Sequence, residues 1–187
     1  MAINLSEFEQ LAEQNTRKQQ EKEEQRKQEE ENRRKQKEKE QDEELDQLRN
    51  IKSYILSEDF ENWLSSRLNM KKEEIKEKGY FSFNVSEYKR RIDYSNVNPY
   101  GIVETEYNVH FGCFHNKRSV FFTFTKQCGE EKSPHRKTAY SMVREILDLI
   151  EDRLIEITKN KFIIERREEK DGNYKTTTYY IRFLLNE

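Results

Sequence analysis

The sequence predicts an α+β protein: an antiparallel sheet of about five strands, packed by helices on one face and preceded by a long charged N-terminal helix. All five glycines and both prolines lie at or beyond residue 79, so no strong helix breaker precedes it. Residues 13–44 contain no apolar side chain. After Gly79 the apolar residues change from helical spacing to alternation, which is typical of strands. We therefore expect a charged helical arm at 1–50 and an α+β domain at 51–187.

The arm begins with a short apolar tip. Ser6 and Glu9 have the spacing of a capping box, in which each side chain accepts a hydrogen bond from a backbone N–H of the first turn. Leu5, Phe8 and Leu11 then follow at helical spacing. This tip is our candidate surface for binding a protein partner.

The charged stretch after the tip is expected to form a coiled-coil-like helix without a seam. It offers Glu–Lys and Glu–Arg pairs four residues apart, among them Glu23 with Lys27 and Glu31 with Lys35. It has no apolar a and d positions, which excludes a conventional coiled coil. The alternative is a solvated, partly disordered spacer, because such a composition cannot bury a core.

Helical spacing returns before Gly79. Four apolar residues at 45, 48, 51 and 55 give the end of the arm a face that can pack. Ser57 is a candidate N-cap for a further helix that carries Phe60 and Trp63 and ends at Gly79. We expect Trp63, the one tryptophan of the chain, to anchor the core beneath the sheet.

The strands are expected next. Phe81, Phe83 and Val85 alternate with polar residues, and a turn signal at 98–101 precedes a second alternating run at 103–111. A third apolar run follows at 120–124.

If that hairpin turns at 116–117, Phe111 pairs with Phe122 and Val109 with Phe124. Residues 126–137 read as a polar loop with a glycine and a proline.

The last part of the chain should hold one long helix and a hairpin. Apolar residues from Val143 to Ile157 recur at helical spacing, which predicts a helix over 138–159. Strands at 162–167 and 174–185 flank Asp171-Gly172, a hairpin turn signal. A single core is expected to unite this helix with the central strands, with these residues buried: Phe111, Phe122, Phe124, Val143, Ile146, Ile150 and Leu154.

The histidines and cysteines are close in sequence but are not expected to bind a metal. They lie at His110, Cys113, His115, Cys128 and His135. In the expected hairpin register Cys128 falls opposite Thr105, eight residues along the strand from Cys113, or roughly 26 Å at about 3.3 Å per residue. A shared zinc ion would require another register, so we expect ordinary thiols and surface imidazoles.

The sequence contains no P-loop, GxGxxG, GxSxG or HExxH motif, and we expect neither an enzyme nor a cofactor. It lacks a secretory signal and an apolar run long enough to span a bilayer, and it has only two cysteines. We therefore expect a cytoplasmic protein with no membrane partner.

Basic residues interleaved with aromatics suggest an alternative, a nucleic-acid interface. Phosphates would contact the basic side chains while bases stack on the rings. The clusters come from separated segments, and residues 79–187 hold 18 basic against 16 acidic residues, a difference of only +2. The candidate residues for this alternative are Lys89, Arg90, Arg91, Lys117, Arg118, Arg136 and Lys137.

The sequence favours a non-enzymatic protein-interaction or adaptor protein, in which the domain binds one partner and the arm acts as a spacer or reaches a second. The alternative is a nucleic-acid-binding accessory protein. The bias toward Lys, Glu, Asn and Ile is typical of an AT-rich genome, which would fit a phage or mobile element.

Overall fold

The computed structural model describes residues 5–94, 96, 102–112, 118–126, 133–159 and 161–183. Side chains are described from Glu13 onward within these ranges, except those of residues 118, 125 and 126. The chain divides into two compact units, one that ends at Asp42 and one that begins at Glu43. Each unit is described separately below.

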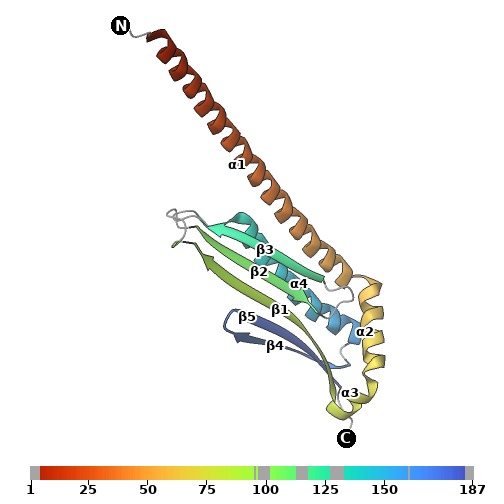
Figure 1. Ribbon diagram of the computed structural model, residues 1–187. Coiled ribbons are helices and arrows are strands. Elements are labelled where there is room, and N and C mark those ends of the chain that lie inside the picture. The colour runs from red at the N-terminus through yellow and green to blue at the C-terminus, as the bar shows by residue number, and fades with distance from the viewer. Residues whose placement is uncertain are drawn as a thin grey trace. The chain divides into compact units, whose positions relative to one another are not determined.

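The first unit is helical, and this confirms the prediction of a long charged N-terminal helix. Helix α1 (Leu5–Ile55) begins in this unit and continues into the second (Figure 1). Predicted pairs are formed in it: Lys27 Nζ lies 3.1 Å from Glu23 Oε1, and Lys35 Nζ lies 2.7 Å from Glu31 Oε1. Every residue from Glu13 to Glu40 is exposed, so these local pairs act without support from a core.

The second unit starts with the end of α1. Leu45, Leu48, Ile51 and Ile55 are all buried, as their spacing predicts. Ser57 occupies the N-cap position, but its hydroxyl donates backward to the Tyr54 carbonyl at 2.7 Å and caps nothing.

The helix expected from Ser57 to Gly79 is in fact two helices, α2 (Glu58–Met70) and α3 (Lys72–Lys78). α2 buries Phe60, Trp63 and Leu64, whereas α3 has no fully buried residue to hold it in line with α2. Gly79 ends α3 as predicted, with a left-handed φ of 74° that glycine adopts without steric cost.

The sheet has five strands in the order β3-β2-β1-β5-β4, and every neighbouring pair is antiparallel. The helices of this unit cover one face of the sheet (Figure 1), which confirms the predicted fold class. Helix α4 (Pro134–Thr158) connects β3 to β4. The strands are β1 (Tyr80–Asp93), β2 (Val103–Phe111), β3 (Arg118–Lys126), β4 (Ile163–Asp171) and β5 (Tyr174–Arg182).

Three further local predictions, all in the part after Gly79, were wrong. β3 pairs with β2 four residues away from the expected register, with Val109 opposite Val120 and Tyr107 opposite Phe122. An even shift leaves the same side chains on the buried face, so the alternation alone cannot distinguish the two registers.

β1 continues to Asp93, where a strand near 81–85 was expected, because β2 pairs with its polar half. Helix α4 begins at Pro134, inside the expected loop, since proline fits the first turn of a helix.

One core unites the second unit. Ile146, Ile150 and Leu154 of α4 lie in it with Phe111, Phe122 and Phe124, as predicted. Trp63 packs edge-on against Phe83 with ring centroids 5.6 Å apart, which places it under the sheet. The buried Tyr179 hydroxyl donates to the Leu147 carbonyl at 2.7 Å and ties β5 to α4.

Candidate anion-binding site

The structure brings together some of the basic residues that the sequence singled out. Lys89 Nζ lies 4.6 Å from the centroid of the Tyr140 ring, and the Arg136 guanidinium lies 5.5 Å from the same centroid. Alternation along β1 places Arg90 on the other face of the sheet, where the strand register sets it opposite Glu106 of β2. Arg91 and Lys137 are exposed. Lys117 and the side chain of Arg118 lie outside the described residues.

The candidate partner-binding tip has a described backbone only. Leu5, Phe8 and Leu11 lie in helix α1, and their side chains are outside the described residues.

The structure describes two of the five histidines and cysteines. His110 is exposed in β2 and His135 lies in the first turn of α4. The residues at 113, 115 and 128 lie outside the described ranges. Within the described ranges no group of three or more histidine, cysteine or acidic side chains could hold a metal ion.

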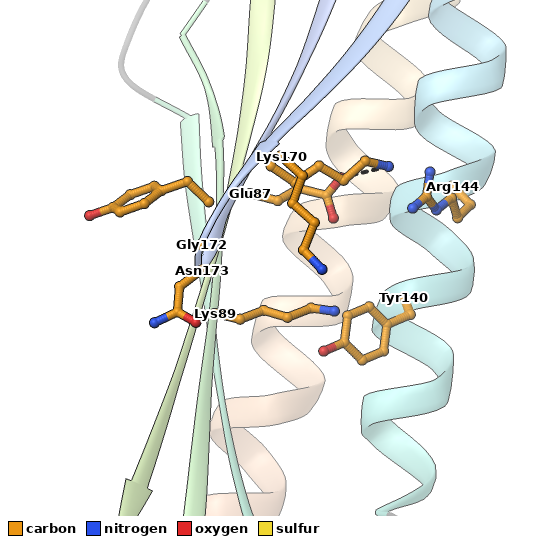
Figure 2. Close-up of a pocket in the computed structure, with 9 residues that line it drawn as sticks. Glu87, Lys89, Tyr140, Arg144, Lys170, Gly172 and Asn173 are labelled. Atoms are coloured by element: carbon orange, nitrogen blue, oxygen red, sulfur yellow. Dashed lines mark ion pairs between the residues drawn. The ribbon is translucent and has the colours of Figure 1, made fainter.

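A cavity of about 390 Å³ lies where the β4–β5 hairpin ends beside α4 (Figure 2). We call this cavity the hairpin pocket. β1 continues beyond Tyr88, which pairs with Tyr174, the first residue of β5. The Lys89 amide then donates to the Asn173 carbonyl in the turn at 3.0 Å. The sharp turn is possible because Gly172 adopts a φ of 54°. The residues lining the pocket are Glu87, Lys89, Tyr140, Arg144, Lys170, Gly172, Asn173, Tyr174 and Lys175.

A row of charged side chains crosses three strands at the floor of the pocket. Register places Lys170 of β4 opposite Lys175 of β5, and Lys175 opposite Glu87 of β1. Glu87 is only 5% exposed. Its Oε2 accepts a hydrogen bond from the Tyr107 hydroxyl at 2.6 Å, and its Oε1 lies 3.9 Å from Lys175 Nζ. Burial, together with the neighbouring Glu87 carboxylate, raises the pKa of Tyr107, so this phenol stays a donor.

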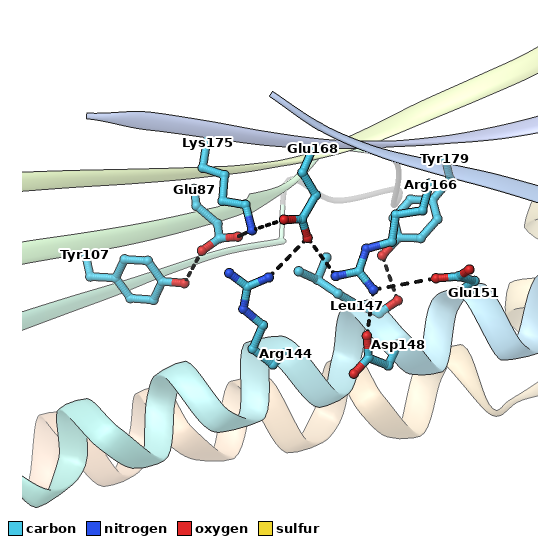
Figure 3. A network of polar contacts seen from close by, with 10 residues as sticks. All are labelled: Glu87, Tyr107, Arg144, Leu147, Asp148, Glu151, Arg166, Glu168, Lys175 and Tyr179. Atoms are coloured by element: carbon cyan, nitrogen blue, oxygen red, sulfur yellow. Dashed lines mark hydrogen bonds and ion pairs between the residues drawn. The ribbon is translucent and has the colours of Figure 1, made fainter. Parts of the chain in front are cut away.

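Glu168 of β4 organises the basic side chains beside the pocket (Figure 3). Its carboxylate lies 2.6 Å from Lys175 Nζ, 2.8 Å from Arg166 and 3.1 Å from Arg144. The hydrogen bond from Lys175, helped by that from Arg166, lowers the pKa of Glu168 to about 2. Arg166 also forms an ion pair with Asp148, with Nη1 2.6 Å from Oδ1.

Tyr140 forms the helix-side wall. Its ring centroid lies 4.5 Å from that of Tyr107, so the two rings are in contact. The Lys89 ammonium lies over the Tyr140 ring, a cation–π arrangement that holds this lysine at the pocket (Figure 2). No described residue is a hydrogen-bond partner of the Tyr140 hydroxyl, although this oxygen is buried.

This arrangement is suited to binding an anion. Lys89 and Lys170 have no carboxylate within ion-pair distance in the described part of the chain, and Arg144 and Lys175 share Glu168. Such a surplus of donors around one cavity favours a ligand with several acceptor oxygens. The arrangement does not resemble a continuous basic track, because several other cations in the described part of the unit, among them Arg153, Arg167 and Arg182, are paired with acids.

The sequence reading missed most of the pocket. Glu87, Arg144, Lys170 and Lys175 were not among the candidates, since they are spread over four elements. One signal was available: Lys175 alternates in phase with Thr177, Tyr179 and Ile181, so it had to lie on the helix-covered face.

Comparison of the chain with protein-family models, with curated proteins and with solved structures finds no match. Among the described residues, no helix combines the length and the apolar character needed to cross a membrane.

Proposed function

We propose that this chain is a non-enzymatic protein-interaction protein, an adaptor in which the arm and the folded unit each offer a binding surface. The exposure of residues 13–40 of α1 is the observation that carries this proposal. Every residue from Glu13 to Glu40 is exposed and buries no apolar surface. Helices in proteins gain most of their stability from packing, so an unpacked helix of this length serves something other than the fold.

The apolar tip is the proposed partner-binding element of the arm. Leu5, Phe8 and Leu11 have the spacing with which an amphipathic helix enters an apolar groove of a partner. Residues 5–42 extend along the helix axis for roughly 57 Å at about 1.5 Å per residue. The charged stretch therefore acts as a spacer that separates the tip from residue 43 along the chain.

The test uses the full-length protein as bait in an extract treated with nuclease. We expect a defined protein to be captured, and its purified form to bind directly. Capture and direct binding should be lost when Phe8→Ala and Leu11→Ala are combined. The matched control combines Gln14→Ala and Gln19→Ala, which change the same helix without touching the tip and should leave binding intact. Binding that survives the tip substitutions would contradict the role of the tip and would leave the folded unit as the binding surface.

A nucleic-acid-binding accessory protein is the second candidate. The convergence of Lys89 and Arg136 on Tyr140, together with Arg144, supports it. The test is combined replacement of Lys89, Arg90 and Arg91 by Glu in a binding assay at several salt concentrations. Loss of a tight, steeply salt-dependent affinity would favour this candidate over the adaptor.

A further inference from the structure

The hairpin pocket has donors in excess. Lys89 and Lys170 are exposed lysines without an ion-pair partner in the described ranges, and Lys175 is mostly covered with its ammonium between Glu87 and Glu168. Arg144 reaches the same space from α4 (Figure 2). These side chains come from three strands or their ends and one helix, so their convergence is a property of the fold and not of one basic segment.

The pocket also contains an acceptor that is short of donors. Glu87 Oε1 is buried, and no described residue donates a hydrogen bond to it; the Lys175 ammonium stays 3.9 Å away. A buried carboxylate oxygen without a donor is costly, and a ligand that brings a proton would remove that cost. An anion without a proton could not donate a hydrogen bond to this oxygen.

We propose that the hairpin pocket binds a phosphate group that keeps one proton, with its free oxygens on the lysines and Arg144 and its P–OH donating to Glu87 Oε1. The cavity of about 390 Å³ holds such a group with room for what it is attached to. The Tyr140 hydroxyl supplies one more hydrogen-bonding group at the wall.

The acceptor decides which anions fit. A phosphate monoester has a second pKa of about 6, so a share of it is protonated near that pH. Sulfate and the phosphodiester of a nucleic-acid backbone carry no such proton and would place a bare oxygen against the Glu87 carboxylate. The site should therefore select phosphate over sulfate, and terminal phosphates over internal ones.

This inference goes beyond the proposed adaptor function and does not depend on it. The phosphate has two conceivable sources, the free ion and a phosphorylated side chain of a protein partner. The second would make the pocket the partner-binding surface of the folded unit. The phosphate test does not involve Phe8 or Leu11, so its failure would leave the proposal for the tip standing, and the reverse also holds.

The experiment titrates the full-length protein, followed by NMR at about pH 6 and fixed ionic strength, with inorganic phosphate, sulfate, a phosphoserine peptide and an oligonucleotide without terminal phosphates. We expect phosphate and the peptide to shift resonances of the pocket, and sulfate to bind at least roughly tenfold more weakly. Tighter binding of the peptide than of free phosphate would identify a phosphorylated partner as the source. Tighter binding of free phosphate than of the peptide would identify the free ion as the ligand. Equal binding of sulfate, no binding of either inorganic phosphate or the phosphoserine peptide, or tighter binding of the oligonucleotide would overturn the proposal.

Two variants, each at one kind of group, test the role of the Glu87 acceptor separately from that of the basic donors, and a third serves as a control. Glu87→Gln can donate its amide N–H to an unprotonated oxygen, so it should lower the preference for phosphate over sulfate by roughly tenfold. Glu106→Gln makes the same change on the opposite face of the sheet and should leave the preference unchanged. Lys170→Gln, at an exposed position where folding is not at risk, should weaken phosphate roughly tenfold. An unaltered preference in folded Glu87→Gln, or unaltered affinity in Lys170→Gln, would also refute the assignment.

Discussion

Helix α4 and the Glu13–Asp42 part of α1 are both helices dense in charge, yet they are stabilised by different means. α4 buries Val143, Ile146, Ile150 and Leu154 on one side and presents its charges on the other. The α1 segment has no buried side. Its charges instead pair with one another at i,i+4, as in Glu31 with Lys35. The ion pairs of the α1 segment are therefore exposed and screened by salt, whereas some polar contacts of the folded unit, such as that between Tyr107 and Glu87, are buried.

The largest expected effect tests the buried side of α4. Ile150→Ala should lower the free energy of unfolding by about 2–5 kcal/mol, because Ile150 is 0% exposed and its loss leaves a cavity. Ile155→Ala is the matched control on the same helix, since Ile155 is 38% exposed and should cost well under half as much. Urea denaturation followed by tryptophan fluorescence measures both. Equal losses would mean that α4 is not divided into a buried and an exposed side.

A buried polar contact should come next. Tyr107→Phe removes the hydrogen bond to Glu87 and leaves that carboxylate buried with fewer donors, at an expected cost of about 1–3 kcal/mol. Tyr174→Phe removes the same hydroxyl from a side chain that is 57% exposed and should be nearly neutral. Thermal unfolding of the two variants side by side checks this. A neutral Tyr107→Phe would show that the buried hydroxyl contributes nothing to stability.

The half-exposed network around Glu168 should give an intermediate, pH-dependent effect. Folding lowers the pKa of Glu168 from 4.5 to about 2, so its contribution is present above pH 4.5 and is lost as the pH falls toward 2. Since its side chain is 37% exposed, we expect on the order of 1 kcal/mol after allowance for solvent screening. Glu168→Gln should therefore reduce stability at neutral pH and flatten the stability profile between pH 4.5 and 2. A profile as steep as that of the parent protein would assign the acid sensitivity to other groups.

The smallest effect is expected in the exposed helix. A peptide of residues 13–42 should be monomeric and partly helical by circular dichroism, and its helicity should fall as salt rises, because its pairs are exposed. Glu31→Gln should lower the helix signal at low salt only. Asn32→Gln, at a neighbouring position, is the control and should not. Salt-independent helicity, or a stable oligomer in sedimentation, would show that something other than these pairs holds the segment.

Local sequence patterns were sufficient to predict the secondary structure of several segments. The apolar spacing of α4, the absence of breakers before Gly79 and the Asp171-Gly172 turn each fix a local conformation through neighbours in the chain. The same is true of the i,i+4 pairs of α1. The fold class could be predicted from these features, because each of them depends only on residues that are close together in the chain.

Other features depend on contacts between residues that are far apart in the chain. The β2–β3 register differs from the expected one by an even step that leaves the buried face unchanged, so alternation could not choose between them. The polar end of β1 became a strand because β2 pairs with it, and no local signal marks that pairing. The hairpin pocket is the clearest case. Glu87, Arg144 and Lys170 are far apart in sequence, and they line one pocket because the strand order places β5 beside β1 and β4 beside β5, while α4 supplies the facing wall.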